Sequence, residues 1–297
     1  MQEEGIIISN ASNTYVVEDI KSNEILKCNA RGKFKEQGTS LTVGDYVEYE
    51  VIDSEKKEGV INTVKDRKSY IKRPKIANLT QIILVISMKM PKPDLLMLDK
   101  QLVFAELNGI KPIICLNKID LEDEQYIQSI ASVYRKIGYD VYETNANEKI
   151  GIDGIRNILQ GNITAFSGNS GVGKSTLINA IFGEDTTKQG VISQKNKRGK
   201  NTTTSTYLYK IDETTYLADT PGFSTFDVNE IEIEELYKYF IEFVEYEKDC
   251  EFIGCTHVKE ESCGIKKAVS EGKISKERYD RFCKIYSELK EREARKW

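Results

Sequence analysis

A glycine-rich segment at residues 168–175 limits what this chain can fold into more than any other feature of the sequence. It reads Gly168-Asn169-Ser170-Gly171-Val172-Gly173-Lys174-Ser175, follows the apolar run 163–167 and precedes a helical stretch that begins near Thr176. A strand, a G-x-x-x-x-G-K-S loop and a helix in this order form a phosphate loop, because inward-facing backbone N–H groups and the helix N-terminus attract an anion. Lys174 would reach the terminal phosphates and Ser175 would bind Mg²⁺. The segment predicts an α/β domain that binds a nucleoside triphosphate, but it does not indicate which base the nucleotide carries.

The pattern around this loop predicts a multidomain α/β protein. Residues 1–67 hold five short β-branched runs separated by turn residues, which indicates an OB-like β-barrel, although other small barrels fit the same pattern. Residues 68–230 alternate apolar strands with amphipathic helices, as in a mostly parallel sheet, and residues 231–297 predict a helical module. We expect strands at 81–85, 112–116, 140–143, 163–167, 206–210 and 215–218, and helices at 95–108, 122–137, 151–159 and 174–182.

Composition and charge exclude several classes of protein. The longest apolar run, 82–86, is far shorter than the about 20 residues that cross a bilayer, and the first four residues do not resemble a signal peptide. We therefore expect a cytoplasmic protein with no membrane contact. We also expect it to be a monomer. A net charge of −4 argues against bulk positive charge as the means of holding nucleic acid, and we expect no DNA partner, although local basic zones remain compatible with RNA.

A second motif, Asn117-Lys118-Ile119-Asp120, follows the predicted strand 112–116, at the edge of a parallel sheet where ligands collect. The Asp120 carboxylate could accept N–H bonds from guanine N1 and its 2-amino group, which adenine does not offer. Asn117 would bond the base or brace the phosphate loop, and the stem of Lys118 would lie over the base. An ordinary strand-end turn is the alternative, but it is less consistent beside a phosphate loop. The motif predicts GTP and GDP as ligands.

Asn145-Ala146, after the next strand, occupies the place where GTPases carry a small loop over the guanine. The indication is weaker, because the usual first residue is serine.

The run Asp219-Thr220-Pro221-Gly222 follows another predicted strand. Asp219 would lie near Mg²⁺ through a water molecule and the Gly222 amide near the γ-phosphate, so that hydrolysis releases the loop. One threonine of 202–204 could complete the Mg²⁺ shell, and which one stays open. Lys174, Ser175, Asp219 and Gly222 form the predicted catalytic set.

Phe223 occupies the position where many GTPases carry the glutamine that orients the attacking water. A phenyl ring cannot do this, so we expect slow intrinsic hydrolysis that a partner raises.

The order of these motifs is rearranged. The base motif at 117 precedes the phosphate loop at 168 and the D-T-P-G run at 219, whereas GTPases usually begin with the phosphate loop. Because surface termini tolerate relocation, the order predicts a circularly permuted GTPase domain. The D-T-P-G run then leads directly into the C-terminal module.

Three of the six cysteines and the only histidine fall within 14 residues, at Cys250, Cys255, His257 and Cys263. Three thiolates and an imidazole predict one closed tetrahedral Zn²⁺ site per chain, with a structural role. Inert buried cysteines are an alternative, and a redox role is disfavoured because no Cys-x-x-Cys pair is present.

Two basic zones accompany the cluster. Residues 264–297 carry 11 basic and 6 acidic residues, net +5, and a second zone includes Lys195, Lys197, Arg198 and Lys200. Both zones could face RNA phosphates. Alternatively, the zone at 264–297 could simply be the solvent-exposed end of a helix.

The barrel, the permuted GTPase motifs and the Cys-x₄-Cys-x-His-x₅-Cys cluster together resemble the small ribosomal subunit biogenesis GTPase family, RsgA (also called YjeQ), across essentially the whole chain. The resemblance implies an OB-fold, a permuted GTPase domain and a zinc domain that act on the small ribosomal subunit and its 16S rRNA late in maturation. It assigns nucleotide contacts to residues 168–176, Asn117, Lys118 and Asp120, and zinc ligation to the four-residue cluster. The family commonly has G-R-H-T-T-T in its first switch, whereas this chain carries Asn201 in place of the histidine. A histidine-based catalytic role cannot apply at that position.

We therefore expect a Mg²⁺-dependent GTPase that hydrolyses GTP to GDP and phosphate, is slow without its ribosomal partner, and leaves the subunit after hydrolysis. One alternative is a non-catalytic, GTP-gated RNA-binding module. Another is a permuted GTPase of large-subunit assembly, which the N-terminal barrel and the cysteine cluster make less consistent with the sequence.

Overall fold

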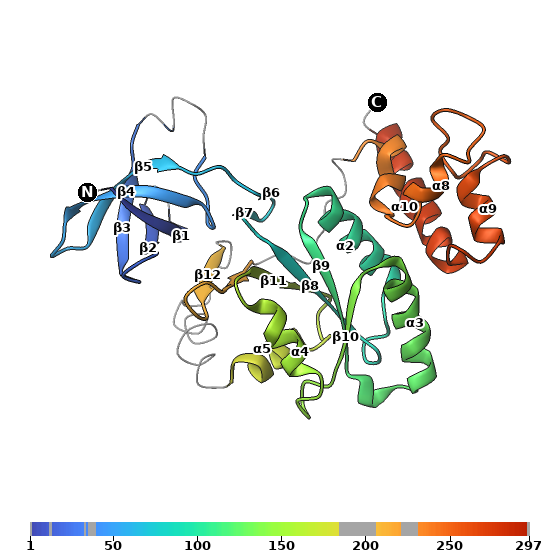
Figure 1. Ribbon diagram of the computed structural model, residues 1–297, viewed down its shortest axis with the longest axis horizontal. Helices are drawn as coiled ribbons and strands as arrows, with labels where there is room; N and C mark the ends of the chain where they lie inside the picture. Colours follow the sequence, from blue (N-terminus) through green and yellow to red (C-terminus); the bar gives the residue numbers. More distant parts are fainter. Residues whose placement is uncertain are drawn as a thin grey trace. The chain divides into compact units, whose positions relative to one another are not determined.

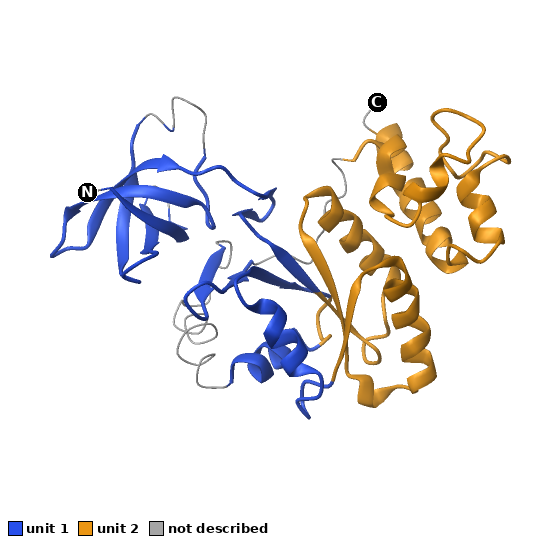
Figure 2. Ribbon diagram, in the orientation of Figure 1, with its two compact units in different colours: residues 1–83, 145–168, 173–224 blue, residues 84–144, 169–172, 225–297 orange. Residues whose placement is uncertain are grey.

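A computed structural model describes residues 2–11, 14–32, 34, 40–183, 206–220 and 231–295. The chain divides into two compact units (Figure 2). Unit 1 comprises residues 1–83, 145–168 and 173–224, and unit 2 comprises residues 84–144, 169–172 and 225–297. None of the described helices is both long and apolar enough to span a membrane.

The N-terminal part of unit 1 is a closed five-stranded barrel (Figure 1). Strand β1 pairs antiparallel with β2 on one side and with β4 on the other, while β3 and β5 close the barrel as a parallel pair. Alternate residues point inward, as in β3, because successive side chains in a strand face opposite sides. This confirms the predicted barrel. Its strands are β1 (Glu3–Ala11), β2 (Thr14–Asp19), β3 (Ile25–Ala30), β4 (Tyr46–Asp53) and β5 (Glu58–Val64).

The segment after the barrel forms a hairpin of β6 (Tyr70–Lys72) and β7 (Lys75–Ala77), two strands that the sequence analysis did not predict. Gly44 explains how the hairpin approaches the barrel so closely. Its φ of +90° suits glycine, and a Cβ there would lie 2.0 Å from the carbonyl oxygen of Ala77. No periodicity signal in the sequence marks a contact of this kind.

The rest of unit 1 continues the barrel into the GTPase sheet. Strand β11 (Ile163–Ser167) pairs parallel with β13 (Tyr216–Asp219), which pairs antiparallel with β12 (Tyr207–Lys210). Strand β12 then pairs with barrel strand β1 at Ser9 and Tyr207. Helices α4 (Ile152–Leu159) and α5 (Lys174–Phe182) complete the unit.

Unit 2 contains the strand order β10-β9-β8, with β9 (Lys111–Asn117) and β10 (Asp140–Thr144) parallel. Strand β8 (Gln81–Ser87) crosses the boundary between the units, and all seven of its residues are buried. Helices α2 (Leu95–Leu107) and α3 (Glu124–Ile137) belong to the same unit. These elements agree with the predicted alternation of strands and helices.

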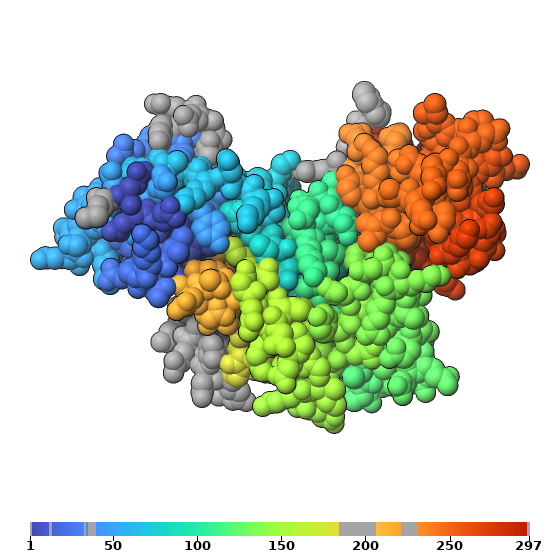
Figure 3. All heavy atoms as spheres, in the orientation of Figure 1, coloured from blue at the N-terminus to red at the C-terminus, as the bar shows by residue number. Residues whose placement is uncertain are grey.

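The C-terminal module, residues 231–295, is helical as expected and belongs to unit 2 with α2 and α3. Its elements are the 3₁₀ helix η3 (Ile233–Tyr239) and the α-helices α8 (Val244–Glu247), α9 (Gly264–Ser270) and α10 (Lys276–Ala294). Aromatic rings fill its centre. Phe240, Phe243 and Phe282 pack against one another, and their ring centroids are 5.0 to 5.2 Å apart. In the space-filling view, α2, α3 and this module form one continuous surface (Figure 3).

Candidate nucleotide site and metal cluster

The glycine-rich segment has the backbone of a phosphate loop. It follows β11 and ends at α5, whose N-cap is Gly173. Gly168, Gly171 and Gly173 have φ values of 145°, 81° and 99°, which side chains other than glycine rarely adopt. The predicted strand-loop-helix context is therefore present.

Lys174 and Ser175 begin helix α5. The Lys174 ammonium donates to the carbonyl oxygen of Gly168 at 2.6 Å, so its side chain folds back over the loop. Ser175 and Thr176 are exposed in the first turn. A cation above the loop and an accessible hydroxyl at the helix start are the groups that a phosphate and its Mg²⁺ require.

The base motif contacts the phosphate loop within unit 2. Asn117, at the end of β9, is 1% exposed, and its Nδ2 donates to the Val172 carbonyl at 3.0 Å. Its Oδ1 accepts from the Thr144 hydroxyl at 3.0 Å. Of the two roles that the sequence left open for Asn117, this geometry matches bracing of the loop.

Lys118 joins two loops. Its φ of 61° is left-handed, and its ammonium donates to the carbonyl oxygens of Gly171 at 2.7 Å and Met90 at 2.6 Å. Asp120 follows in the exposed 3₁₀ turn Ile119–Leu121. An exposed carboxylate at this edge is accessible to a base.

The Met90 contact reveals a loop that the sequence analysis missed. Residues 88–94 follow β8, and the Met88 amide donates to the Asn117 carbonyl at 2.9 Å. The Cδ atom of Pro91 lies 3.7 Å from where a Cβ of Gly171 would be. Only the prolines of this loop could have drawn attention to it, because its contacts use backbone groups that any residue carries.

Asn145 caps a turn. Its side-chain oxygen accepts from the amides of Asn147 at 3.1 Å and Glu148 at 3.3 Å, and it is 2% exposed. An asparagine can make this local turn bond at the position where serine is usual.

Part of the predicted catalytic set lies outside the described residues. Asp219 ends β13 and is half-buried, and the buried Thr220 follows it. Gly222, the remaining member of the set, belongs to a range that the structure does not describe. The same is true of other residues that the sequence analysis singled out, namely Pro221, Phe223, Asn201, the threonines 202–204 and the basic residues of 195–200.

The four cluster residues come together as the sequence predicted. The ligand atoms of Cys250, Cys255, His257 and Cys263 all lie within 4.8 Å of one another. The Nδ1 atom of His257 is 3.6 Å from Cys250 Sγ and 3.5 Å from Cys263 Sγ, and these two sulfurs are 3.9 Å apart. A tetrahedral ion with metal–sulfur bonds of about 2.3 Å and metal–nitrogen bonds of about 2.0 Å has edges of about 3.8 and 3.6 Å. The donor set therefore fits a tetrahedral metal ion.

The surroundings of the cluster favour metal ligation. The Gly264 amide donates to Cys250 Sγ at 3.3 Å, and the Tyr279 hydroxyl holds the His257 carbonyl at 2.8 Å. Burial lowers the pKa of His257, which favours the neutral imidazole that can ligate a metal. Burial raises the pKa of the Cys255 thiol to about 12, a cost to the thiolate that a bound cation would offset.

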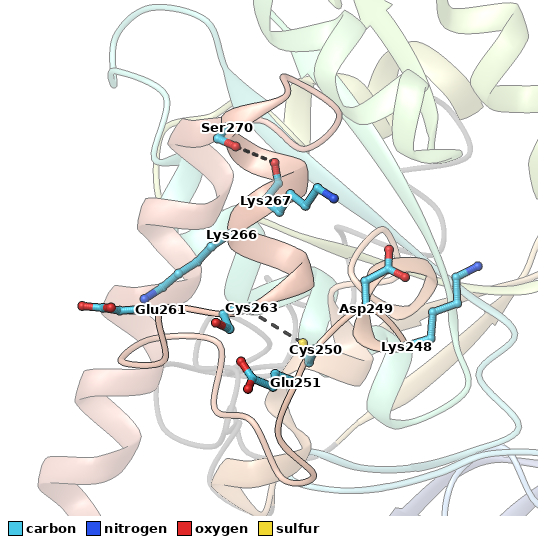
Figure 4. Close-up of a pocket in the computed structure, with 10 residues that line it drawn as sticks. Lys248, Asp249, Cys250, Glu251, Glu261, Cys263, Lys266, Lys267 and Ser270 are labelled. Carbon is cyan, nitrogen blue, oxygen red and sulfur yellow. Dashed lines mark hydrogen bonds between the residues drawn. The ribbon is translucent and has the colours of Figure 1, made fainter.

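A cavity of about 560 Å³ lies beside the cluster (Figure 4). Cys250 and Cys263 line it together with Lys248, Lys266 and Lys267. Lys266 donates to the Glu260 carbonyl at 2.8 Å, so this cation supports the loop between the cysteines.

Comparison with known proteins finds relatives that match nearly the whole chain. The family described as RsgA GTPase matches residues 64–229, and the RsgA N-terminal domain matches residues 4–61. The "Small ribosomal subunit biogenesis GTPase RsgA" of Clostridium botulinum (strain Loch Maree / Type A3) is 41% identical over 293 residues, 99% of each chain. That of Alkaliphilus metalliredigens (strain QYMF) is 38% identical and covers 96% of this chain and 97% of its own.

Two solved structures share the whole architecture. YjeQ from Thermotoga maritima has a TM-score of 0.84 at 38% identity, covering 97% of this chain and 99% of its own. YloQ, described as a circularly permuted GTPase, has a TM-score of 0.82 at 35% identity, and the match covers 98% of this chain and 96% of YloQ. With its closed barrel, its base motif ahead of its phosphate loop and relatives matching it from end to end, the chain belongs to the RsgA GTPase family.

Proposed function

We propose that this protein binds the small ribosomal subunit and assists its late maturation, hydrolysing GTP to GDP and phosphate with stimulation by the subunit. Membership of the RsgA GTPase family supports the reaction, and the printed name of the relatives supports the partner. The observation that carries the proposal is the contact of Asn117 and Lys118 with Val172 and Gly171, which joins the base motif to the phosphate loop.

In this proposal the nucleotide residues have separate roles. Residues 168–176 surround the phosphates, Lys174 neutralises developing charge, and Ser175 and Asp219 hold Mg²⁺, the second through water. Asp120 selects guanine by accepting two N–H bonds, and the Gly222 amide senses the γ-phosphate. Positioning and electrostatic stabilisation account for such chemistry, so a partner that orders the switch raises the rate.

We assign Cys250, Cys255, His257 and Cys263 as ligands of one structural Zn²⁺ per chain. Thiolate and imidazole donors suit zinc, and four protein ligands leave no open position for a catalytic water. Bound zinc would act as a cross-link between the ends of the 250–263 segment. We divide the chain accordingly into a barrel (1–67), a permuted GTPase domain (68–230) and a zinc module (231–297).

The partner would be recognised through 16S rRNA by the barrel and the zinc module of a cytoplasmic monomer. Exposed cations on the module, among them Lys267, Lys284 and Lys290, can neutralise phosphates. Not every basic residue of 264–297 is available, because Arg278 is fully buried.

GTP turnover with and without purified small subunits tests the proposal. We expect a slow basal rate, a large stimulation by small subunits, and little of either with ATP. Large subunits serve as the matched control. Equal stimulation by both subunits, or equal turnover of ATP, would contradict it. Release from the subunit that is equally fast with GTP and a slowly hydrolysed analogue would show that turnover does not control release.

A further inference from the structure

Arg278 of α10 is a buried cation that reaches out of the C-terminal module. Its Nη1 donates to Asp99 Oδ1 of α2 at 2.6 Å, and both side chains are 0% exposed. Its Nε donates to Glu242 of its own module. Phe240 packs under the guanidinium, which lies 4.7 Å from the ring centroid. A buried charge that loses its partner is strongly destabilising, so this contact holds α10 on α2.

Asp99 is the centre of the network. Besides Arg278, it accepts from Arg281 of α10 and, at 2.8 Å, from the Tyr134 hydroxyl of α3. Three donors from two other helices thus converge on one carboxylate in the second turn of α2. Asp99 and Arg278 lie 179 residues apart in the chain.

A short segment with restricted backbone conformations connects helix α2 to the loops of the nucleotide site. The Asp94 side chain caps α2 by accepting from the Met97 amide at 2.9 Å, and prolines at 91 and 93 restrict the residues before it. This short segment leads back to Met90, whose carbonyl accepts from the Lys118 ammonium. The same ammonium donates to Gly171 of the phosphate loop.

We propose that Asp99 is a positioning residue for nucleotide binding: Arg278 and Arg281 hold α2 through it, and α2 sets the Met90 carbonyl that orients Lys118 against the phosphate loop. The inference rests on the proposed function, and it makes the C-terminal module a determinant of nucleotide affinity. A module shifted by a partner would change the affinity for GTP, and by linkage nucleotide binding would steady the module.

Two substitutions, each of which removes one negative charge from this network, distinguish a positioning role from a purely stabilising one. Asp99→Asn leaves one acceptor oxygen for three donors and so weakens the contact with α2, whereas Glu242→Gln removes a carboxylate that bonds Arg278 but lies outside α2. We expect both to lower the unfolding temperature, and only Asp99→Asn to weaken binding of a fluorescent GDP, by about tenfold. Glu288→Gln is a second control, because Glu288 pairs with Lys100 between the same two helices at an exposed position.

The full-length protein is titrated with fluorescent GDP below the unfolding temperature of each variant. Amide exchange at Met88, which donates to the Asn117 carbonyl, gives a local readout and should quicken only in Asp99→Asn. If that variant does not fold, Asp99→Glu replaces it, since one extra methylene keeps the charge but displaces α2. Equal GDP affinity in wild type and the Asp99 variant, or equal losses in the Asp99 and Glu242 variants, would overturn the inference alone. A wild-type protein that binds no guanine nucleotide would overturn both it and the proposed function.

Discussion

Replacing Asn117 with alanine tests whether this side chain braces the phosphate loop or serves the base. Its amide nitrogen donates to the Val172 carbonyl and its oxygen accepts from the Thr144 hydroxyl, both at 3.0 Å. Neither bond involves a nucleotide. A bracing role must therefore appear in the stability of the nucleotide-free protein.

The structure sets the expected magnitude. A buried polar group that loses its partner costs about 1–3 kcal/mol. Val172 loses the Asn117 amide, whereas the Thr144 hydroxyl keeps a contact with Cys115 Sγ at 3.3 Å, so most of the cost falls on the loop carbonyl. We expect Asn117→Ala to lower the free energy of unfolding by about 1–3 kcal/mol. At about 2–4 °C per kcal/mol for units of this size, the midpoint falls by several degrees.

Thermal unfolding without nucleotide, followed by circular dichroism, measures the loss. Asn108→Ala is the control, because Asn108 makes one bond of 2.8 Å to the Phe104 carbonyl at the end of α2 and touches neither loop. It should cost about 1 kcal/mol. Thr144→Val combined with Asn117→Ala should be less damaging than the sum of the two, by about 0.5–3 kcal/mol. Should Asn117→Ala unfold at the wild-type midpoint and only weaken GDP binding, the bracing role is wrong and the side chain contacts the base.

Three further predictions follow from other residues. Asp120→Asn should shift preference from guanosine to xanthosine nucleotides, because the amide nitrogen of asparagine can donate to the carbonyl that xanthine carries in place of the guanine 2-amino group. Competition binding with both nucleotides checks this, and an unchanged preference would refute the assigned role. Cys263→Ser, or treatment with a zinc chelator, should unfold the C-terminal module, since metal binding and folding are coupled. The near-ultraviolet circular dichroism should lose the part of the tyrosine signal that the module contributes, and an unchanged spectrum after proven metal loss would count against a structural ion. Although burial opposes it, bonds from the amides of Ser22 and Lys21 and from the hydroxyls of Tyr49 and Ser22 hold the pKa of Asp19 below its ordinary value. The stability it adds is therefore present above the unfolded-state value of about 3.9 and is lost as the pH falls through the lower folded value. Asp19→Asn should flatten the acid side of the stability curve, and an unaltered slope below about pH 4 would disprove the contribution.

The nucleotide loops were predictable because they depend on local backbone geometry. Gly168, Gly171 and Gly173 adopt φ values that glycine permits, and β11 and α5 flank them as the apolar pattern indicates. The cysteine cluster was predictable for a similar reason, since its four donors lie within one short segment. The five barrel strands followed from the alternation of β-branched runs with turn residues.

Contacts between residues far apart in the chain were decided by the tertiary structure. The sequence marks 264–297 as a basic surface, yet Arg278 lies fully buried because Asp99 and Glu242 meet it from other segments. The contact of Lys118 with the Met90 carbonyl uses a backbone group that no residue type identifies.

The sequence by itself therefore determined the local make-up of the candidate sites, since each motif brings its chemical groups together over a few residues. The tertiary structure alone decided which charges face solvent and which, like Arg278, are buried against a partner. The physical reason is that the free energy of burying a charge depends on its partner, and that partner can lie anywhere along the chain.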